Sequence, residues 1–454
     1  MISQKAKSIT VAVLLFTVMV VIMNSLSSQS SQSLRLSSEA LQTNQTCYGV
    51  IFDAGSSSTK LGVYSWPCRD DVSIPEINPI TILSDKISPG LSTFANNLTA
   101  IDGYLSGLLL KVKSVVPVEL QPTTPIMLGA TAGMRLIPIE QQTAILEQTY
   151  TFFNNSGFYF EGSKWNRVIT GQEEGTFLWI ATNYLKGTIK NNTDLQGTNN
   201  QTFATIDLGG ASTQISFKPA PPEQTDEYDF NVTLPENNDY TLYSISYLGY
   251  GNDQARNNVV QLSTNKTDNI TFTGCYNNGY QTQLDGMTVE GNSNSEECIQ
   301  SIKQFLNSTN CTYSSQQCSI NSTYQAIIPY NTQIIAVSGV NAAMTSFNLS
   351  SPFSPYQLLE EAKKFCSLDF QTVSKLEPTN PYVSTKCFLG LYASTLLIDG
   401  YKVGSRLIES PSKIQGAEPT WSLGFLFNEV SNMNCDLSDE SCKGLKSIFK
   451  AFKL

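Results

Sequence analysis

The chain has 454 residues, of which 41% are hydrophobic, and it carries a formal net charge of −10 at pH 7. This length exceeds what one hydrophobic core usually serves, so two lobes are expected. The acidic balance argues against a nucleic-acid partner. The absence of histidine excludes Ser–His and Cys–His nucleophile pairs and His-ligated zinc, so acid–base chemistry at neutral pH must fall to carboxylates.

The first 24 residues are predicted to form a signal peptide or an uncleaved signal anchor. Lys5 and Lys7 precede an apolar run from Ile9 to Met23, which is shorter than the roughly 20 residues that a membrane span needs. Residues 25–45 are rich in Ser and Gln and are predicted to be a disordered stalk. The protein is therefore expected to be secreted or to reside in the secretory-pathway lumen. Membrane contact is expected only if the N-terminal signal stays uncleaved and anchors the chain.

Sequons and cysteines also indicate export. Asn-x-Ser/Thr sequons recur from Asn44 to Asn348, and the ten cysteines, an even number, predict five disulfides of an oxidising compartment. A thiolate metal site is the weaker interpretation, because no Cys-x-x-Cys spacing occurs. Short separations favour the pairs Cys47–Cys68, Cys366–Cys387 and Cys435–Cys442. Cys275, Cys298, Cys311 and Cys318 allow three pairings.

Two segments share an Asp-x-Gly-x-x-Ser-Thr pattern between strand-like runs. Residues 48–64 read YGVIFDAGSSSTKLGVY, and residues 203–217 read FATIDLGGASTQISF. Each predicts a β-hairpin whose tip can bring backbone N–H groups and hydroxyls close to a ligand. One such hairpin alone is also an ordinary tight turn, whereas the repetition favours a polyphosphate clamp made of two matched copies.

Superposition of the two patterns aligns Asp53 with Asp207. An aspartate at the end of the first strand of each hairpin can hold a hydrated cation. The residues at the two tips are the candidate phosphate ligands: Gly55, Ser56, Ser57, Ser58, Thr59, Gly209, Gly210, Ala211 and Ser212.

Two helix and strand patterns lie between the hairpins. Residues 99–116 show apolar residues at helical spacing, with Thr99 as the candidate N-cap, and are interpreted as a core helix. Residues 126–135 read IMLGATAGMR, a buried strand that breaks into a turn of small residues, where Thr131 and Ala132 allow close approach of a ligand. Arg135 at its end is either a phosphate partner or a structural ion-pair residue.

Residues 168–185 read VITGQEEGTFLWIATNYL and predict a strand, a Gly turn and an amphipathic helix. Glu173 and Glu174 open this helix. Acidic residues at a helix N-terminus usually only complement the helix dipole, so their position alone does not indicate catalysis.

In order and spacing, these motifs resemble those of the ecto-nucleoside triphosphate diphosphohydrolase (apyrase) family of the actin/hexokinase/heat-shock-chaperone ATPase superfamily. Four segments resemble the first four conserved regions of that family: DAGSSST at 53–59, GATAGMR at 129–135, TGQEEG at 170–175 and DLGGAST at 207–213. Further similarity lies in residues 86–97, 246–256, 387–401 and 421–425.

The resemblance implies an α/β fold of two ribonuclease-H-like (actin-like) lobes, each a mixed β-sheet flanked by helices, with the active site in the interlobe cleft. Lobe I is expected over residues 46–170, lobe II over 171–411, and a return to lobe I over 412–454. A monomer is expected. The family pattern also implies the crossed disulfides Cys275–Cys311 and Cys298–Cys318.

The implied activity is hydrolysis of nucleoside tri- and diphosphates by direct attack of water, with Ca²⁺ or Mg²⁺ as cofactor. Asp53 and Asp207 would hold the cation through water. Glu174 would accept a proton from the attacking water, with the adjacent Glu173 as its rival. Ser212 and Gln214 would position that water.

The fifth conserved region departs from the family. Residues 336–347 read AVSGVNAAMTSF, where family members usually carry aromatic residues, and Lys386 stands where promiscuous members carry a base-stacking tyrosine. Loss of stacking predicts weak base discrimination. A kinase of the same superfamily, a non-catalytic nucleotide-binding module and an exopolyphosphatase are the alternatives. The retained Asp53, Glu174 and Asp207 argue against the binding module.

Overall fold

The computed structural model describes residues 45–69, 72–189, 201–220, 226–236, 238–262, 265–267, 270–284, 286–312 and 314–433. The predicted signal segment and the predicted pair Cys435–Cys442 lie outside these residues. In the ranges that are described, no helix is both long and apolar enough to cross a membrane.

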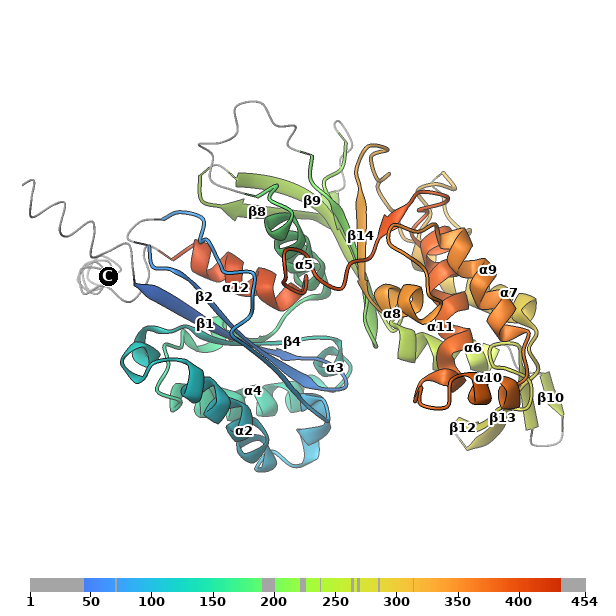
Figure 1. The fold of residues 1–454 in the computed structure, drawn as a ribbon, viewed down its shortest axis with the longest axis horizontal. Helices are drawn as coiled ribbons and strands as arrows, with labels where there is room; N and C mark the ends of the chain where they lie inside the picture. The colour runs from blue at the N-terminus through green and yellow to red at the C-terminus, as the bar shows by residue number, and fades with distance from the viewer. Residues whose placement is uncertain are drawn as a thin grey trace, which may run out of the picture.

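The first sheet has five strands in the order β3-β2-β1-β4-β5 (Figure 1). Apolar side chains alternate along β1, so Val50 and Phe52 join one core cluster and Ile51 joins another. Helices α2 and α4 cover the first face, and α12 covers the second. The strands are β1 (Thr46–Ala54), β2 (Thr59–Pro67), β3 (Leu83–Ile87), β4 (Ile126–Ala130) and β5 (Asn166–Val168).

The second sheet has six strands in the order β15-β14-β6-β7-β9-β8. It mixes parallel pairs, such as β14 with β6, and antiparallel pairs, such as β6 with β7. A third sheet of four strands has the order β10-β11-β13-β12. The strands are β6 (Ala204–Leu208), β7 (Ser212–Phe217), β8 (Asp229–Leu234), β9 (Asn238–Leu248), β10 (Asn265–Thr267), β11 (Ile270–Thr273), β12 (Gln281–Leu284), β13 (Met287–Gly291), β14 (Ile334–Ser338) and β15 (Ile408–Glu409).

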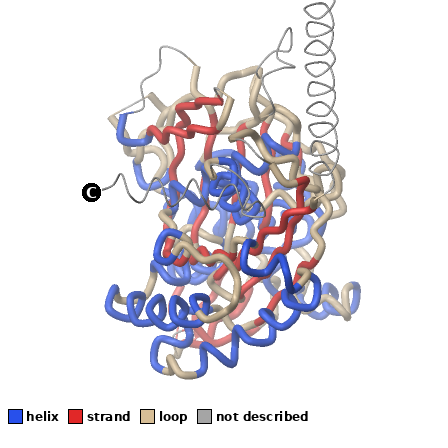
Figure 2. Tube along the Cα trace, turned by 90° about the vertical axis from the view of Figure 1, so that its left-hand side faces the viewer, coloured by secondary structure: helices blue, strands red, loops and turns tan. Residues whose placement is uncertain are grey.

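Helices lie at the periphery of the molecule and also at its centre among the strands, as Figure 2 shows. The α-helices are α2 (Ala100–Val115), α3 (Ala132–Arg135), α4 (Ile139–Asn154), α5 (Gly171–Leu185), α6 (Asn252–Leu262), α7 (Ser295–Leu306), α8 (Gly339–Ser346), α9 (Pro355–Cys366), α10 (Phe370–Leu376), α11 (Val383–Thr395) and α12 (Trp421–Ser431). The predicted α/β fold with mixed sheets flanked by helices is confirmed.

Helices α5 and α12 form a layer between the first two sheets (Figure 1). They cross at Gly424, where a Cβ atom would lie only 1.8 Å from the carbonyl oxygen of Phe177. The rings of Phe177 and Phe425 stack beside this crossing, with centroids 5.1 Å apart. Only glycine permits this approach, and one core cluster runs through the layer from β1 to β14.

The helix predicted over residues 99–116 is α2, which spans Ala100–Val115. The prediction that Thr99 caps it is wrong. Thr99 has helical backbone angles, and its side chain makes no capping hydrogen bond. Its hydroxyl donates to Oδ1 of Asn97 at 3.2 Å instead.

Four disulfides lie among the described residues. Cys47–Cys68 and Cys366–Cys387 are as predicted. The crossed pairing is wrong, because the bonds are Cys275–Cys298 and Cys311–Cys318. The physical reason is a close approach after β11: a Cβ atom on Gly274 would lie 1.9 Å from the carbonyl oxygen of Asn294, and this contact puts the next residue, Cys275, beside the first turn of α7.

Candidate active site

The two repeated motifs form β-hairpins with the same tip. The backbone N–H of Gly55 donates to the carbonyl of Ser58 at 2.9 Å, and that of Gly209 donates to the carbonyl of Ser212 at 3.0 Å. β1 pairs with β2 and β6 pairs with β7, both antiparallel. The hairpins predicted from the repeat are confirmed.

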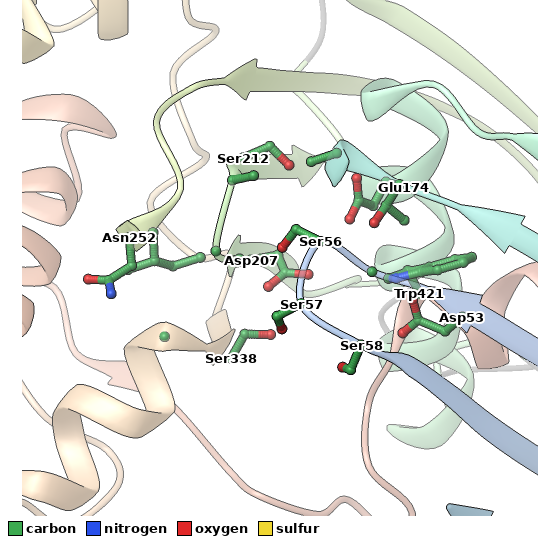
Figure 3. Close-up of a pocket in the computed structure, with 18 of the residues that line it drawn as sticks. Asp53, Ser56, Ser57, Ser58, Glu174, Asp207, Ser212, Asn252, Ser338 and Trp421 are labelled. Atoms are coloured by element: carbon green, nitrogen blue, oxygen red, sulfur yellow. The ribbon is translucent and has the colours of Figure 1, made fainter. Parts of the chain in front are cut away.

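The two tips face each other across a cavity of about 490 Å³ (Figure 3). A Cβ atom on Gly210 would lie 3.2 Å from Oγ of Ser56, so the tips approach closely. The turn after β4 supports the first tip, because a Cβ atom on Gly133 would lie 2.6 Å from Cα of Ser56. The cavity is therefore bordered by backbone and small side chains, which suits a ligand rich in hydrogen-bond acceptors.

Most of the predicted site residues come together at this cavity. Those that line it are Asp53, Gly55, Ser56, Ser57, Ser58, Thr131, Ala132, Glu174, Asp207, Gly209, Gly210, Ala211 and Ser212. Three predicted residues do not line it. Thr59 is fully buried at the start of β2, whereas Arg135 and Gln214 lie behind the wall and contact Glu174.

Three buried carboxylates face the cavity, namely Asp53, Glu174 and Asp207, each 8% exposed. Burial raises the pKa of Glu174 to about 7 and the pKa of Asp53 to about 6, and the charge of Asp207 adds to both shifts. Burial also raises the pKa of Asp207, against a hydrogen bond from Ser338. A bound cation would favour the ionised form of all three.

Glu174 is held by two side chains. Nη2 of Arg135 donates to its Oε2 at 2.7 Å, and Nε2 of Gln214 donates to the same oxygen at 3.3 Å. Both nitrogens also reach Oγ of Ser212, at 3.2 Å and 2.7 Å respectively. The structure thus gives Arg135 the ion-pair role rather than a place at the cavity wall.

Glu173 points away from the cavity. Its side chain accepts a hydrogen bond from the backbone N–H of Thr170 at 2.8 Å, which completes a capping box at the start of α5. It also accepts one from Arg167 at 2.9 Å. Burial alone would raise the pKa of Glu173, but these hydrogen bonds lower it below its usual value. A carboxylate held ionised in this way is a poor base, so Glu174 is the better candidate.

Asp53 and Asp207 fit a hydrated divalent cation. Oδ1 of Asp207 is buried and has no hydrogen-bond partner among the described residues, so it has an unused acceptor at the cavity. Carboxylate oxygens are the ligands that Ca²⁺ and Mg²⁺ prefer, and Mg²⁺ usually keeps several waters. Over the ranges that the structure covers, no three Cys, Asp or Glu side chains are grouped to hold a metal ion directly.

The fifth conserved region only partly reaches the cavity. Ser338, Gly339 and Ala342 line it, whereas Val340, on the buried side of α8, is fully buried. Lys386, at the position of the family's base-stacking tyrosine, does not line the cavity. Its side chain is 7% exposed, is ion-paired with Glu377 and lies over the rings of Phe347 and Phe365 at 5.1 Å and 4.5 Å. The ion pair and the two cation–π contacts offset the free-energy cost of burying the ammonium group in the core.

Several lining residues were not predicted as site residues: Lys60, Lys86, Asn252, Asp253, Ser338, Thr420 and Trp421. Asn252 and Trp421 lie in segments whose similarity to the family was noted without a role, and Lys60 directly follows the first motif. Ser338 has a φ of 56°. This conformation is rare for a residue with a side chain and often marks a functional site, but no sequence signal reveals it.

A family model described as GDA1/CD39 (nucleoside phosphatase) matches residues 39–444. The chain is 31% identical to ectonucleoside triphosphate diphosphohydrolase 1 of Bos taurus, covering 84% of this chain and 80% of the relative. It is also 31% identical to ectonucleoside triphosphate diphosphohydrolase 8 of Gallus gallus, covering 88% and 86%. Among solved structures, nucleoside triphosphate hydrolases from Neospora caninum share the fold, with a TM-score of 0.63 at 15% identity over 90% of this chain and 97% of that chain.

Proposed function

The chain belongs to the GDA1/CD39 (nucleoside phosphatase) family, and we propose that it is an apyrase that removes the terminal phosphate from nucleoside tri- and diphosphates. One observation carries this proposal. The buried carboxylate of Glu174 faces the cavity between two hairpin tips, and Arg135 and Gln214 fix its orientation. A positioned carboxylate beside a phosphate-sized clamp suits activation of water.

In the proposed reaction, Glu174 accepts a proton from a water molecule. The water oxygen attacks the terminal phosphorus, and the bond from this phosphorus to the bridging oxygen breaks. The products are orthophosphate and a nucleotide with one phosphate fewer, and the proton passes from Glu174 to solvent. A pKa of about 7 suits this role, because a base acts best when its pKa is close to the working pH. Ser212 and Gln214 would position the water.

The phosphate chain would lie between the two tips. Backbone N–H groups and hydroxyls of small residues would bind its oxygens, with little contact to the base. The proposed ligands are Gly55, Ser56, Ser57, Ser58, Thr131, Ala132, Gly209, Gly210, Ala211 and Ser212. Thr59 and Arg135 are left out of this set because they do not line the cavity.

Ca²⁺ or Mg²⁺ is the proposed cofactor, held through water by Asp53 and Asp207. When bound, the cation would neutralise charge on the phosphate oxygens as the anhydride bond breaks. Deprotonation of the two aspartates, whose pKa values burial raises, would accompany its binding.

The proposed organisation is lobe I over residues 46–170 and 412–454, with lobe II over residues 171–411 between them. The cavity fits this division, because Asp53 and Trp421 come from one side and Asp207 and Ser338 from the other (Figure 3). Export into the secretory lumen or beyond the cell is also proposed. Its support is the set of disulfides and the ecto-enzyme names of the relatives.

A phosphate-release panel tests the proposal. ATP, ADP, GDP and UDP would be supplied with Ca²⁺ or Mg²⁺, with and without a chelator, beside a Glu174→Gln control. Cation-dependent release of phosphate from these nucleotides is expected. Release only when an acceptor alcohol is present would indicate a kinase, binding without release would indicate a nucleotide-binding module, and preference for inorganic polyphosphate would indicate an exopolyphosphatase.

A further inference from the structure

A second cavity of about 190 Å³ adjoins the catalytic cavity, and we call it the lateral cavity. Asp53, Lys60 and Thr420 line both cavities. Lys413 and Ser84 line only the lateral cavity. The shared residues make the two cavities neighbours.

The lateral cavity has two lysines that are available to an anion. Lys60 and Lys413 are exposed, and neither makes an ion pair within 4 Å in the described part of the chain. By contrast, Arg135, beside the catalytic cavity, already forms an ion pair with Glu174. An ammonium that is not already paired can turn toward a phosphate oxygen at little cost.

Hydroxyl groups continue from one cavity to the other. The hydroxyl of Tyr64 interacts with the side chains of Thr81 and Thr420, and Oγ1 of Thr420 lies 3.1 Å from Oγ of Ser422. All four residues line the lateral cavity, and Thr420 also faces the catalytic one. Hydroxyls can both donate and accept hydrogen bonds, so they can bind the oxygens and the protonated oxygen of a phosphate along the path between the two cavities.

The positions of the carboxylates and of the exposed border in the catalytic cavity explain why orthophosphate would need a separate exit. The carboxylates of Asp53 and Glu174 are buried, whereas Asp253 and Ala342 at the opposite border are exposed. A nucleotide whose terminal phosphate reaches the carboxylates therefore keeps its nucleoside toward the exposed border. After cleavage, the shortened nucleotide lies between orthophosphate and that border.

We propose that the lateral cavity binds orthophosphate as it leaves the catalytic cavity, so that phosphate departs past Lys60 and Lys413 while the nucleotide departs at the opposite border. This inference rests on the proposed function. Asp53 and Glu418 balance the charges of the two lysines in the lateral cavity. Such a site binds weakly, as an exit must, because a tightly held product would slow turnover.

Two variants change the lateral cavity without touching the catalytic one. Lys413→Gln removes a cation, and Ser84→Trp fills space from the exposed edge strand β3. Lys113→Gln is the matched control, because Lys113 is also exposed but lies on α2 and lines neither cavity. Phosphate formed would be measured by rapid quench, and phosphate released by a fluorescent phosphate-binding protein, with the full-length enzyme.

In Lys413→Gln and Ser84→Trp, cleavage and the KM for nucleotide should stay within about twofold of wild type. Release should lag behind cleavage, and the inhibition constant for orthophosphate should rise by about threefold to tenfold in Lys413→Gln, as expected for loss of one charged contact. Lys113→Gln should match wild type. If both cavity variants release phosphate at the wild-type rate and keep the wild-type inhibition constant for orthophosphate, the proposed exit route is wrong.

A separate measurement keeps this result distinct from a failure of the proposed function. Broadening of the ³¹P line of inorganic phosphate by wild-type protein, reduced in Lys413→Gln and unchanged in Lys113→Gln, would support the lateral site without any turnover. Equal broadening by all three proteins would overturn it. Absence of phosphate release from every nucleotide by wild type would instead refute the proposed function.

Discussion

The guanidinium of Arg135 and the carboxylate of Glu174 form an ion pair of 2.7 Å between the end of α3 and the first turn of α5. Both side chains are largely buried, at 14% and 10% exposure. The pair joins the segment that follows β4 of the first sheet to the helix that lies against the second sheet. It therefore fixes the position of the proposed base and lowers its pKa against the larger effect of burial.

Glu174→Gln should lower kcat by a factor of about 10²–10⁴, because the amide keeps the shape of the side chain but cannot accept the proton. Steady-state phosphate release and circular dichroism would show loss of turnover in a folded protein. Glu173→Gln is the matched control and should keep most of the activity, since Glu173 caps α5 and pairs with Arg167. The reverse outcome would make Glu173 the base.

Arg135→Met should move the acid limb of the pH–rate profile to higher pH. The positive charge of Arg135 lowers the pKa of Glu174 against the larger effect of burial, so its removal raises that pKa further. The base form is then lost at a higher pH as the solution is acidified. Arg167→Met, which removes a cation beside Glu173, should leave the limb in place. An unshifted limb in Arg135→Met would mean that another group limits the rate.

Without a divalent cation, the buried carboxylates should make the folded protein less stable as pH rises. The pKa values of Asp53, about 6, and Glu174, about 7, lie above their unfolded values of 3.8 and 4.5. Their contribution is therefore fully present below about pH 4 and is lost as pH rises through 6 to 7. Ca²⁺ or Mg²⁺ should restore stability at pH 8, by a few degrees in the melting temperature.

Differential scanning fluorimetry from pH 5 to 8, with cation or with chelator, measures this effect. Asp207→Asn is the comparison, because it removes one carboxylate from the cavity and one proposed contact to the cation. The cation should raise its melting temperature less than that of wild type. An equal rise in both proteins would place the cation elsewhere.

Ala342→Trp should lower the KM for nucleotides by about fivefold or more, because an indole at the cavity border can stack on a base and stacking contributes roughly 1–3 kcal/mol. Ala342 is exposed and lines the cavity. Thr345→Trp, also exposed on α8 but not at the cavity, is the control. Wild type should hydrolyse purine and pyrimidine nucleotides with weak discrimination. A preference above about a hundredfold for one base would reveal a pocket that reads it.

Peptide mapping without reduction should find Cys275 joined to Cys298 and Cys311 joined to Cys318. The Cα atoms of these pairs are 4.9 Å and 5.7 Å apart. A peptide that joins Cys275 to Cys311 would contradict the structure and support the crossed arrangement. Titration of the unfolded protein should find no free thiol if Cys435 and Cys442 also pair.

The parts of the site that the sequence predicted are those built by local motifs. Each hairpin tip follows from a few consecutive residues whose glycines and hydroxyls dictate the turn, and Asp53 and Asp207 take their places from the same pattern. The helix that carries Glu174 is likewise local, since Thr170 and Glu173 form its capping box.

Features that depend on distant segments could not be predicted in this way. The partner of Arg135 lies 39 residues along the chain, and the lateral cavity joins Lys60 to Lys413. Lys386 is buried because Phe347 and Phe365 fold over its ammonium. Residue spacing and composition do not predict contacts between distant segments, because tertiary packing determines which side chains come together.

The crossing of α5 with α12 also bears on when the enzyme can become active during synthesis. α12 follows the rest of the described fold in the chain, yet it packs on β1 near its beginning and brings Trp421 to the catalytic cavity. The cavity is incomplete until residues 421–431 have left the ribosome. Until then the apolar faces of α5 and β1 that pack against α12 stay uncovered, so the nascent chain needs protection from aggregation at these two faces.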